Sequence, residues 1–428
     1  MQTQASYSEF STRIHEKART ARGAGFPTQV SIEVTRRCPL ECRHCYNNLA
    51  MNDAGARRAE LTLDEHRRLL DELAECGSLW LLYTGGEIFA RADFLEIYRE
   101  AKSRGFLITL FTNGTMVTPR VADVLGEWRP FSVEITLYGA TRETYESLTQ
   151  IPGSYERCMR GIEALLERKL PLKLKTVPTT VNVHEVYAMQ HLAEELGVEF
   201  KFDPMVNPRI DCSSSPLGVR LSPEQVVALE FHDPHREREY RRMAMDEVAS
   251  GCGAKTEAGH VYSCGGGVNS FAVDPAGRLT ICVLSHRESY DWRRGSLREA
   301  WETFFPRVRY KPRTRPTKCD TCGIQTLCGM CPANGELENG DAEEPVEFLC
   351  QVAHLRAEAL GVPVKRHGAC EFCEQGARHE EVARSARRIR GREINVGEWI
   401  PTPALLPIVG ASHGTCGSGH CSSCSAHS

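Results

Sequence analysis

Nineteen cysteines dominate the chemistry that this 428-residue chain could perform. Three of them lie together in RRCPLECRHCY, at Cys38, Cys42 and Cys45. The later groups and pairs are Cys252, Cys264, Cys282, Cys319, Cys322, Cys328, Cys331, Cys350, Cys370, Cys373, Cys416, Cys421 and Cys424. Dense disulfide frameworks belong to small secreted domains, and a chain of this length can fill its cores without them. The cysteines therefore predict metal or redox chemistry.

The CxxxCxxC spacing of the first group is compatible with three kinds of site. A zinc site needs a fourth Cys or His, and His44 lies inside the loop, where it could not easily complete a tetrahedron. A thiol redox pair uses CxxC and leaves the third cysteine without a role. An iron-sulfur cubane held by three thiolates keeps one iron free of protein ligands, and that iron can bind a substrate or cofactor.

Short β-rich runs alternate with amphipathic helical stretches from Gln29 to about Gln225, which predicts βα units and a parallel sheet. Six units fall short of the eight that close a barrel, so we expect an α/β fold with an open, TIM-like partial (β/α)6 barrel. The expected strands are Gln29 to Thr35, Leu79 to Thr84, Phe106 to Thr112, Phe131 to Tyr138, Leu172 to Pro178 and Val198 to Asp203.

The unusual loops all follow the carboxyl ends of these strands. After the cysteine loop come TGGE (84–87), TNGT (112–115), YGAT (138–141) and PTTVN (178–182). In parallel βα architectures these ends share one face, where ligands and chemistry gather. The loops therefore predict one composite site.

CxxxCxxC after the first strand, GGE after the second and a partial barrel together resemble the radical S-adenosylmethionine (SAM) superfamily. The resemblance implies that the amino and carboxylate groups of SAM bind the open iron of a [4Fe-4S] cluster. It also implies reductive cleavage of SAM to a 5′-deoxyadenosyl radical that takes hydrogen from the substrate, so that the cofactor carries the chemistry. The SAM contacts implied by the family pattern are Tyr46, Gly85, Gly86, Glu87, Asn113 and Thr136. Ile88 replaces the usual proline after GGE.

The second set of cysteines resembles the SPASM extension, a small cysteine-rich domain with little regular structure that holds two auxiliary [4Fe-4S] clusters. By that pattern Cys252, Cys264, Cys282 and Cys331 hold the first cluster, and Cys319, Cys322, Cys328 and Cys350 hold the second. A zinc ribbon is the alternative, but its two knuckles are normally about 15 to 20 residues apart, and here the spacing is far tighter. Val283 stands where related sulfatase maturases tend to carry an acidic residue, which disfavours sulfatase activation.

These patterns divide the chain into six parts. Residues 1–27 are an N-terminal extension, 28–230 the radical SAM core, 231–250 a helical connector, 251–355 the SPASM domain, 356–399 a basic helical segment with CxxC, and 400–428 a flexible Cys/Gly/Ser-rich tail. Three hypotheses stay open for the tail: disorder, metal binding or disulfide exchange, and a cysteine-rich peptide substrate fused to its own enzyme.

Charge and hydropathy limit the kinds of partner and the cellular location that we expect for this chain. With 52 basic and 56 acidic residues, the chain lacks the basic footprint that nucleic acid requires. No apolar run suits a signal peptide or a membrane span, so we expect a cytoplasmic protein. The leading hypothesis is a maturase of a ribosomally made peptide, reduced by a ferredoxin or flavodoxin. One alternative is a radical SAM enzyme acting on a tetrapyrrole or quinone cofactor precursor. The non-enzyme alternatives, an iron-sulfur electron carrier or a zinc-stabilised scaffold, do not explain the GGE loop.

Overall fold

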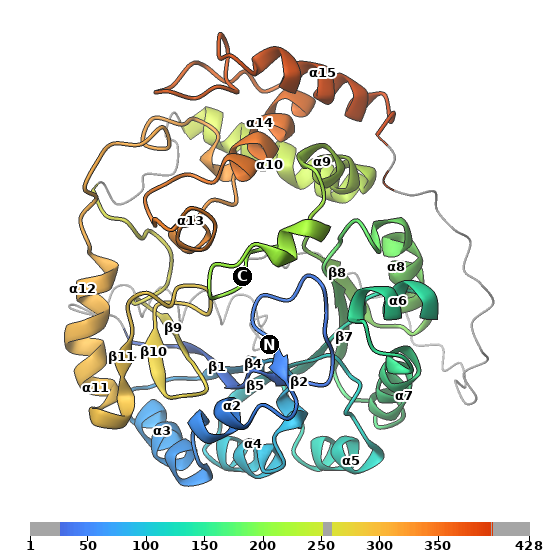
Figure 1. Ribbon diagram of the computed structural model, residues 1–428, viewed down its shortest axis with the longest axis vertical. Helices are drawn as coiled ribbons and strands as arrows, with labels where there is room; N and C mark the ends of the chain where they lie inside the picture. The colour runs from blue at the N-terminus through green and yellow to red at the C-terminus, as the bar shows by residue number, and fades with distance from the viewer. Residues whose placement is uncertain (1–25, 251–258, 395, 397–428) are drawn as a thin grey trace, which may run out of the picture.

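The computed structural model describes residues 26–250, 259–394 and 396, and its central feature is a nine-stranded sheet (Figure 1). In spatial order the strands are β11 (Tyr290–Asp291), β10 (Arg278–Thr280), β9 (Ser270–Val273), β1 (Gln29–Thr35), β4 (Trp80–Gly85), β5 (Leu107–Thr112), β6 (Ser132–Thr136), β7 (Leu172–Thr176) and β8 (Glu199–Phe202). From β1 to β8 every neighbouring pair is parallel. The six predicted strands and the partial barrel are therefore confirmed.

Helices cover the outer side of this curved sheet, as Figure 1 shows. They are α3 (Leu63–Glu75), α4 (Phe94–Ser103), α5 (Pro119–Glu127), α6 (Arg142–Thr149), α7 (Ser154–Glu167) and α8 (Val186–Glu195). Helix α3 begins with a capping box between Thr62 and Glu65, which satisfies two backbone donors at its first turn. A short helix, α2 (Ala54–Ala59), follows the cysteine loop.

The two faces of the strands differ in polarity. In β1, Val30, Ile32 and Val34 are buried in the hydrophobic core. In β7, Leu172 and Leu174 belong to the same core, while the lysines that alternate with them face the other way. A polar inner face in an incomplete barrel is typical of a ligand cavity, because a packed interior would be lined by apolar side chains.

Strand β9 attaches the cysteine-rich region to the barrel sheet, a pairing that the sequence did not predict. It runs parallel to β1, with Gln29 opposite Ser270 and Ile32 opposite Val273, and β10 pairs with it in the antiparallel direction. Cys264 precedes this hairpin. The sheet therefore fixes the start of the cysteine-rich region against the first strand of the barrel.

Helices from the second half of the chain gather at the opposite end of the molecule (Figure 1). They are α9 (Pro223–His232), α10 (Pro234–Ser250), α13 (Pro332–Asn339), α14 (Glu347–Leu360) and α15 (His379–Arg390), while α11 (Leu297–Glu299) and α12 (Phe305–Arg309) lie near β11. A buried ion pair joins α14 to α9: Arg356 donates to both carboxylate oxygens of Glu230, at 2.8 and 2.7 Å.

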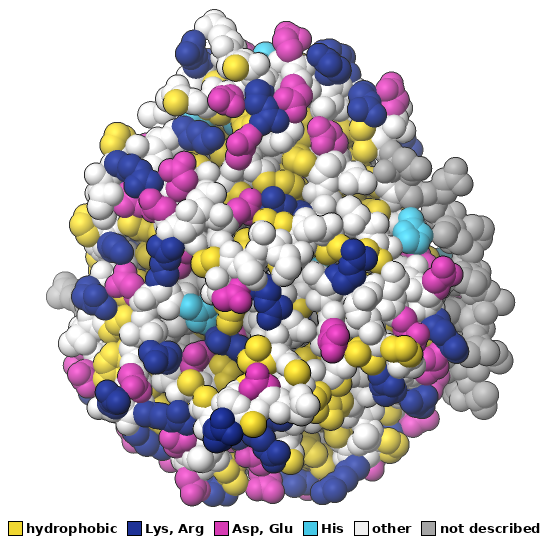
Figure 2. Space-filling view, viewed as in Figure 1, with side chains coloured by type: hydrophobic (Ala, Val, Ile, Leu, Met, Phe, Trp, Pro, Cys, Tyr) yellow, Lys and Arg dark blue, Asp and Glu magenta, His cyan; other side chains and the backbone are white. Residues whose placement is uncertain are grey.

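The surface mixes charges of both signs. On the face drawn in Figure 2, Lys and Arg side chains alternate with Asp and Glu over most of the molecule. Within the described residues, every helix is too short or too polar to cross a lipid bilayer.

Candidate active site

The loop that carries Cys38, Cys42 and Cys45 is fixed at its base and at its middle. Strand β2 (Arg37–Cys38) pairs with β3 (Leu49–Ala50) and closes the base. The amide groups of Glu41 and Arg43 donate to the last carbonyls of α6, at 3.0 and 3.1 Å. These contacts hold the loop against the barrel.

The three thiols of this loop interact with one another; Cys38 is buried, and Cys42 and Cys45 are partly buried. The pKa of Cys38 is raised to about 12, chiefly by burial and also by the nearby Glu87 and Cys45. Burial also raises the pKa of Cys42 well above its usual value, and Cys45 and Cys38 add to the shift. Thiols in such a place ionise when a bound cation compensates the charge, because a coordinating metal deprotonates its thiol ligand.

The spacing of these thiols is wider than a single metal ion requires. In the described part of the chain, one group of three His, Cys or carboxylate ligand atoms lies within 4.8 Å of one another, and it does not include Cys38, Cys42 or Cys45. A mononuclear zinc site holds its ligands closer than that. The three-cysteine loop therefore fits a cluster better than a zinc ion.

Gly85 and Gly86 let the second loop lie directly against the base of the cysteine loop. Gly85 has a φ of +128°, and a Cβ there would meet the carbonyl oxygen of Thr35 at 2.1 Å. A Cβ on Gly86 would meet the carbonyl oxygens of Arg36 and Arg37 at 2.5 and 2.6 Å. The close approach that these two glycines permit is therefore made to the backbone of the cysteine loop.

Glu87 is fully buried, and the protein itself satisfies its carboxylate. Thr112 donates to both oxygens, at 2.7 and 2.9 Å, and the amides of Asn113 and Phe89 donate at 2.8 and 3.2 Å. Burial raises the pKa of Glu87 to about 7 despite these bonds. The side chain of Asn113 reaches Cys38, with 3.5 Å between Nδ2 and Sγ. Glu87 therefore orients Asn113, and Asn113 contacts the first cysteine.

Arg209 is a contact of the cysteine loop that sequence reasoning missed. Its guanidinium donates to the carbonyl oxygens of Cys45 and Asn48, at 3.2 and 2.7 Å, and to Asn48 Oδ1 at 2.9 Å. Asn47 in turn donates to Glu33 of β1 at 2.7 Å. Arg209 follows β8 in a segment that matches no motif, so no signal in the sequence could have identified it.

The other predicted SAM contacts lie in two places. Tyr46 is electrostatically coupled to Cys45 and also to Cys282 of the second cysteine region, and burial raises its pKa well above the usual value. Thr136 ends β6, where it pairs in register with Lys175 of β7. Tyr46 therefore lies between the two cysteine regions, and Thr136 lies at the inner face of the barrel.

A charged cluster on the inner face was also missed. Glu134 of β6 accepts from Lys175 at 3.3 Å and from Lys201 of β8 at 3.0 Å. Lys175 Nζ also lies 2.7 Å from the ring centroid of Phe111. Burial lowers the pKa of Lys175 to about 7, although Glu134 opposes the shift. The strict Leu/Lys alternation of LKLKT was the signal in the sequence that could have predicted inward lysines.

The later cysteines gather into two groups. Cys264, Cys282 and Cys331 interact electrostatically with one another, and burial raises the pKa of Cys282 to about 12. Interactions of the same kind connect Cys319, Cys322, Cys328 and Cys350. Cys331 and Cys328 thus fall in different groups, although only two residues separate them. The other predicted ligand, Cys252, and the tail cysteines lie outside the described residues.

Comparison with known proteins gives the class of this fold and site. Residues 32–193 match the family model described as the Radical SAM superfamily. A protein named AdoMet-dependent heme synthase, from Methanosarcina barkeri, is 28% identical over 338 residues, which span 74% of this chain and 95% of that protein. A PqqA peptide cyclase from Bradyrhizobium diazoefficiens is 31% identical over 186 residues, spanning 44% of this chain and 48% of the cyclase.

A solved structure extends the similarity beyond the barrel. SuiB from Streptococcus suis, bound to the precursor peptide SuiA, is 15% identical, with a TM-score of 0.56 and coverage of 82% of both chains. This likeness concerns the fold. Residues 32–193 match the radical SAM model, the chain is an enzyme, and it shares the fold of SuiB. A radical SAM domain implies a [4Fe-4S] cluster and SAM as cofactors.

Proposed function

We propose that this enzyme binds a [4Fe-4S] cluster through Cys38, Cys42 and Cys45 and modifies a peptide or protein side chain. When bound, the cluster and SAM supply a radical that takes hydrogen from a substrate carbon. The observation that carries the proposal is the set of three mutually interacting thiols, one buried and two partly buried, tied by Asn113 to the GGE loop. No fourth protein ligand is needed, because SAM would take the open iron.

The proposed SAM contacts are Tyr46, Gly85, Gly86, Glu87, Asn113 and Thr136. Within this set the residues have different tasks. Gly85 and Gly86 bring their loop against the cysteine loop. Glu87 acts on SAM chiefly by holding Asn113 and the backbone at Phe89, since the protein occupies its carboxylate oxygens.

We also propose two auxiliary [4Fe-4S] clusters. Cys264, Cys282 and Cys331, with Cys252 as the fourth ligand, would hold one, and Cys319, Cys322, Cys328 and Cys350 the other. The electrostatic grouping of the described thiols supports this partition. The corresponding division of the chain is a core at 28–230, a connector at 231–250 and an auxiliary domain at 251–355. A ferredoxin or flavodoxin would supply the electrons.

A peptide substrate is supported by the open barrel and by the relatives. PqqA peptide cyclases match the core at 31% identity, and SuiB, which shares the fold, was solved with a precursor peptide. Lys175 and Lys201 on the inner face would bind an acidic group of the substrate, because the two ammonium groups share the single carboxylate of Glu134.

A tetrapyrrole is the second candidate substrate, and one comparison favours it. The relatives named AdoMet-dependent heme synthase match over most of their length, up to 95%. The same lysines would suit a substrate that carries carboxylates. The two candidates therefore share a barrel contact and differ in the size and shape of the molecule that enters.

The test is anaerobic turnover of the full-length protein reconstituted with iron and sulfide. With SAM and dithionite it should form 5′-deoxyadenosine, and the absence of that product from iron-loaded protein would reject the proposal. The substrate is then sought by adding, separately, short peptides encoded beside the gene and carboxylated iron porphyrins. A mass change in one class, coupled to deoxyadenosine formation, decides between peptide and tetrapyrrole.

A further inference from the structure

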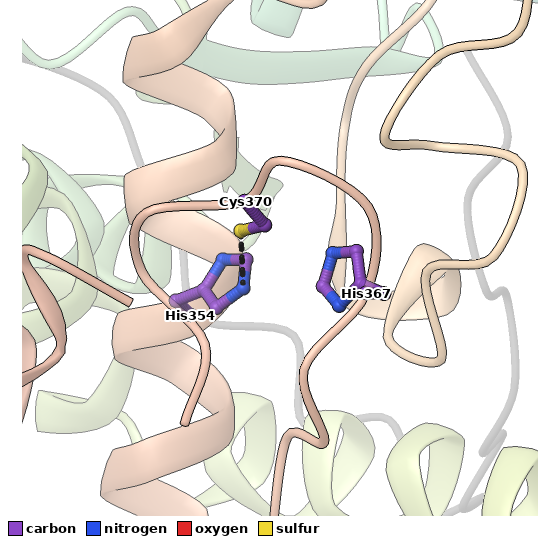
Figure 3. Close-up of side chains that lie close together, drawn as sticks. All are labelled: His354, His367 and Cys370. Atoms are coloured by element: carbon purple, nitrogen blue, oxygen red, sulfur yellow. Dashed lines mark hydrogen bonds between the residues drawn. The ribbon is translucent and has the colours of Figure 1, made fainter. Parts of the chain in front are cut away.

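Three ligand-type side chains meet away from the barrel site, between α14 and the loop that follows it. His354 lies on α14, and His367 and Cys370 lie on the loop (Figure 3). Their ligand atoms all fall within 4.8 Å of one another, and Cys370 Sγ is 3.4 Å from His354 Nε2. Among the residues that the structure describes, this is the group compact enough to hold a single metal ion.

Both histidines are oriented by backbone carbonyl groups. The Nδ1 atom of His354 lies 2.7 Å from the carbonyl oxygen of Cys350, and Nδ1 of His367 lies 3.1 Å from that of Lys365. A carbonyl oxygen can only accept, so Nδ1 must carry the proton in each ring. In the neutral imidazoles, Nε2 is then the atom with a free lone pair. This arrangement is typical of histidines that bind metal.

The spacing fits a tetrahedral ion. Ligands at about 2.0 to 2.3 Å from a tetrahedral zinc ion lie about 3.4 to 3.7 Å from one another. The distance of 3.4 Å between Cys370 Sγ and His354 Nε2 falls in this range. The cysteine groups proposed to hold clusters do not meet the 4.8 Å condition. The site adjoins the second cysteine group, because the side chain of His367 also hydrogen-bonds Cys322 and Cys370 interacts electrostatically with Cys350. Its three ligand atoms are nevertheless the more compact set, as a single ion requires.

The three side chains are also buried, with 3%, 7% and 5% of His354, His367 and Cys370 exposed. The loop from residue 361 to residue 378 forms neither helix nor strand and is held by a few backbone hydrogen bonds together with its side chains. The ring of Phe372 packs on His354, with 5.6 Å between centroids. The three ligand atoms contact one another and Cys322, and one metal ion could bind all three in place of these contacts.

We propose that His354, His367 and Cys370 bind one zinc-class divalent ion, separate from the iron-sulfur clusters. Two nitrogens and one sulfur suit Zn²⁺ and leave its fourth position to water or a small ligand. A cavity of about 230 Å³, lined in part by His354, Phe372 and His379, lies beside the site. The ion ties the loop to α14, one helical turn after Cys350, and so braces the auxiliary cysteine group.

The test uses the full-length chain with Cys416, Cys421 and Cys424 replaced by Ser, so that tail thiols contribute no zinc. This protein is reconstituted with iron, loaded with Zn²⁺ and gel-filtered, and its metals are counted by mass spectrometry. We expect about one zinc per chain. X-ray absorption at the zinc edge does not detect the iron clusters. It should report two nitrogen ligands near 2.0 Å and one sulfur ligand near 2.3 Å, with each distance determined to about 0.1 Å.

Substitutions then assign the ligands. Cys370→Ser and His354→Gln should each lower zinc retention at least tenfold and leave iron and sulfide unchanged. His379→Gln, a histidine beside the same cavity, is the matched control and should keep the zinc. Unmodified protein that retains no zinc would show a hydrogen-bonded cluster without metal and overturn the proposal. An absorption spectrum with sulfur ligands alone, or loss of about four irons from Cys370→Ser, would overturn it as well.

Discussion

The cysteine loop after β1 and the group formed by Cys319, Cys322, Cys328 and Cys350 are built in contrasting ways. The first offers three thiols from one short loop, fixed to β1, α6 and Arg209. The second draws four thiols from an irregular segment and from helix α14. The first site has only three thiols, on a loop that several hydrogen bonds fix. The second has four thiols, on a segment with less regular structure.

This difference indicates that the number of protein ligands determines what each site can do. In a four-iron cluster bound by three thiolates, one iron keeps an open position for a cofactor. A cluster bound by four thiolates has no open position, and its role is then electron transfer or structural support. The rigid support belongs to the site where a reacting atom must be positioned, because small displacements there cost the most activity.

The largest effect should come from the loop with three thiols. In Cys42→Ala the cluster loses one of its only three protein ligands, so 5′-deoxyadenosine formation should fall to background. The measurement is chromatography of anaerobic turnover mixtures containing SAM and dithionite. Iron should drop by about four per chain, while the remaining clusters persist. The exposed Cys212, changed to Ala, is the control; normal deoxyadenosine formation by Cys42→Ala would refute the assignment.

A smaller effect should follow from the group with four thiols. Cys350→Ala should lower iron by about four per chain and abolish substrate modification, but deoxyadenosine formation in the absence of substrate should continue. Cys158→Ala removes an equally buried thiol from α7 and should change neither property. If Cys350→Ala also stops SAM cleavage, the two cysteine regions are not independent.

Loss of the support around the first loop should cost less than loss of a ligand. Arg209→Ala removes three hydrogen bonds to the cysteine loop. Residues that orient metal ligands typically contribute about 10- to 100-fold to activity, and we expect a decrease of that size in deoxyadenosine formation. Kinetics at equal iron content provide the measurement, with the exposed Arg58→Ala as control. An unchanged rate would mean that the loop needs no such support.

The smallest expected effect concerns the inner face of the barrel. Burial lowers the pKa of Lys175 to about 7. Lys175 is therefore protonated below that pH, so an acidic substrate should bind best there, and its KM should rise as the pH increases through 7. Lys175→Gln should raise KM about tenfold at pH 6, equivalent to about 1.4 kcal/mol, and flatten the pH profile. Lys173→Gln, on the same strand, is the control. A KM independent of pH in the unmodified enzyme would contradict this role.

Local patterns predicted most of the barrel. The run QVSIEVT became β1 without a residue of difference, because its β-branched residues and its alternation agree with its buried place. Phe131 to Tyr138 was predicted too long: β6 covers Ser132–Thr136. The strand ends there and the chain turns into its loop, a boundary that propensity alone does not fix.

Contacts between residues far apart in the sequence could not be predicted from local patterns. Strand β9 has four residues, SFAV, and its partner β1 lies more than two hundred residues earlier in the chain, so no local signal joins them. The grouping of His354, His367 and Cys370 was missed for the same reason: a helix and a loop bring together residues whose spacing matches no motif. The cysteine motifs could be recognised because their cysteines are close together in the sequence.

The pairing of β9 with β1 has a consequence for expression of the barrel by itself. A chain that ended at residue 232 would leave one side of the seven-residue strand β1 without its neighbour. Its free amide and carbonyl groups would form an open sheet edge, which is a template for self-association. We therefore expect the isolated barrel to self-associate more readily than the full chain, in which β9 covers this edge.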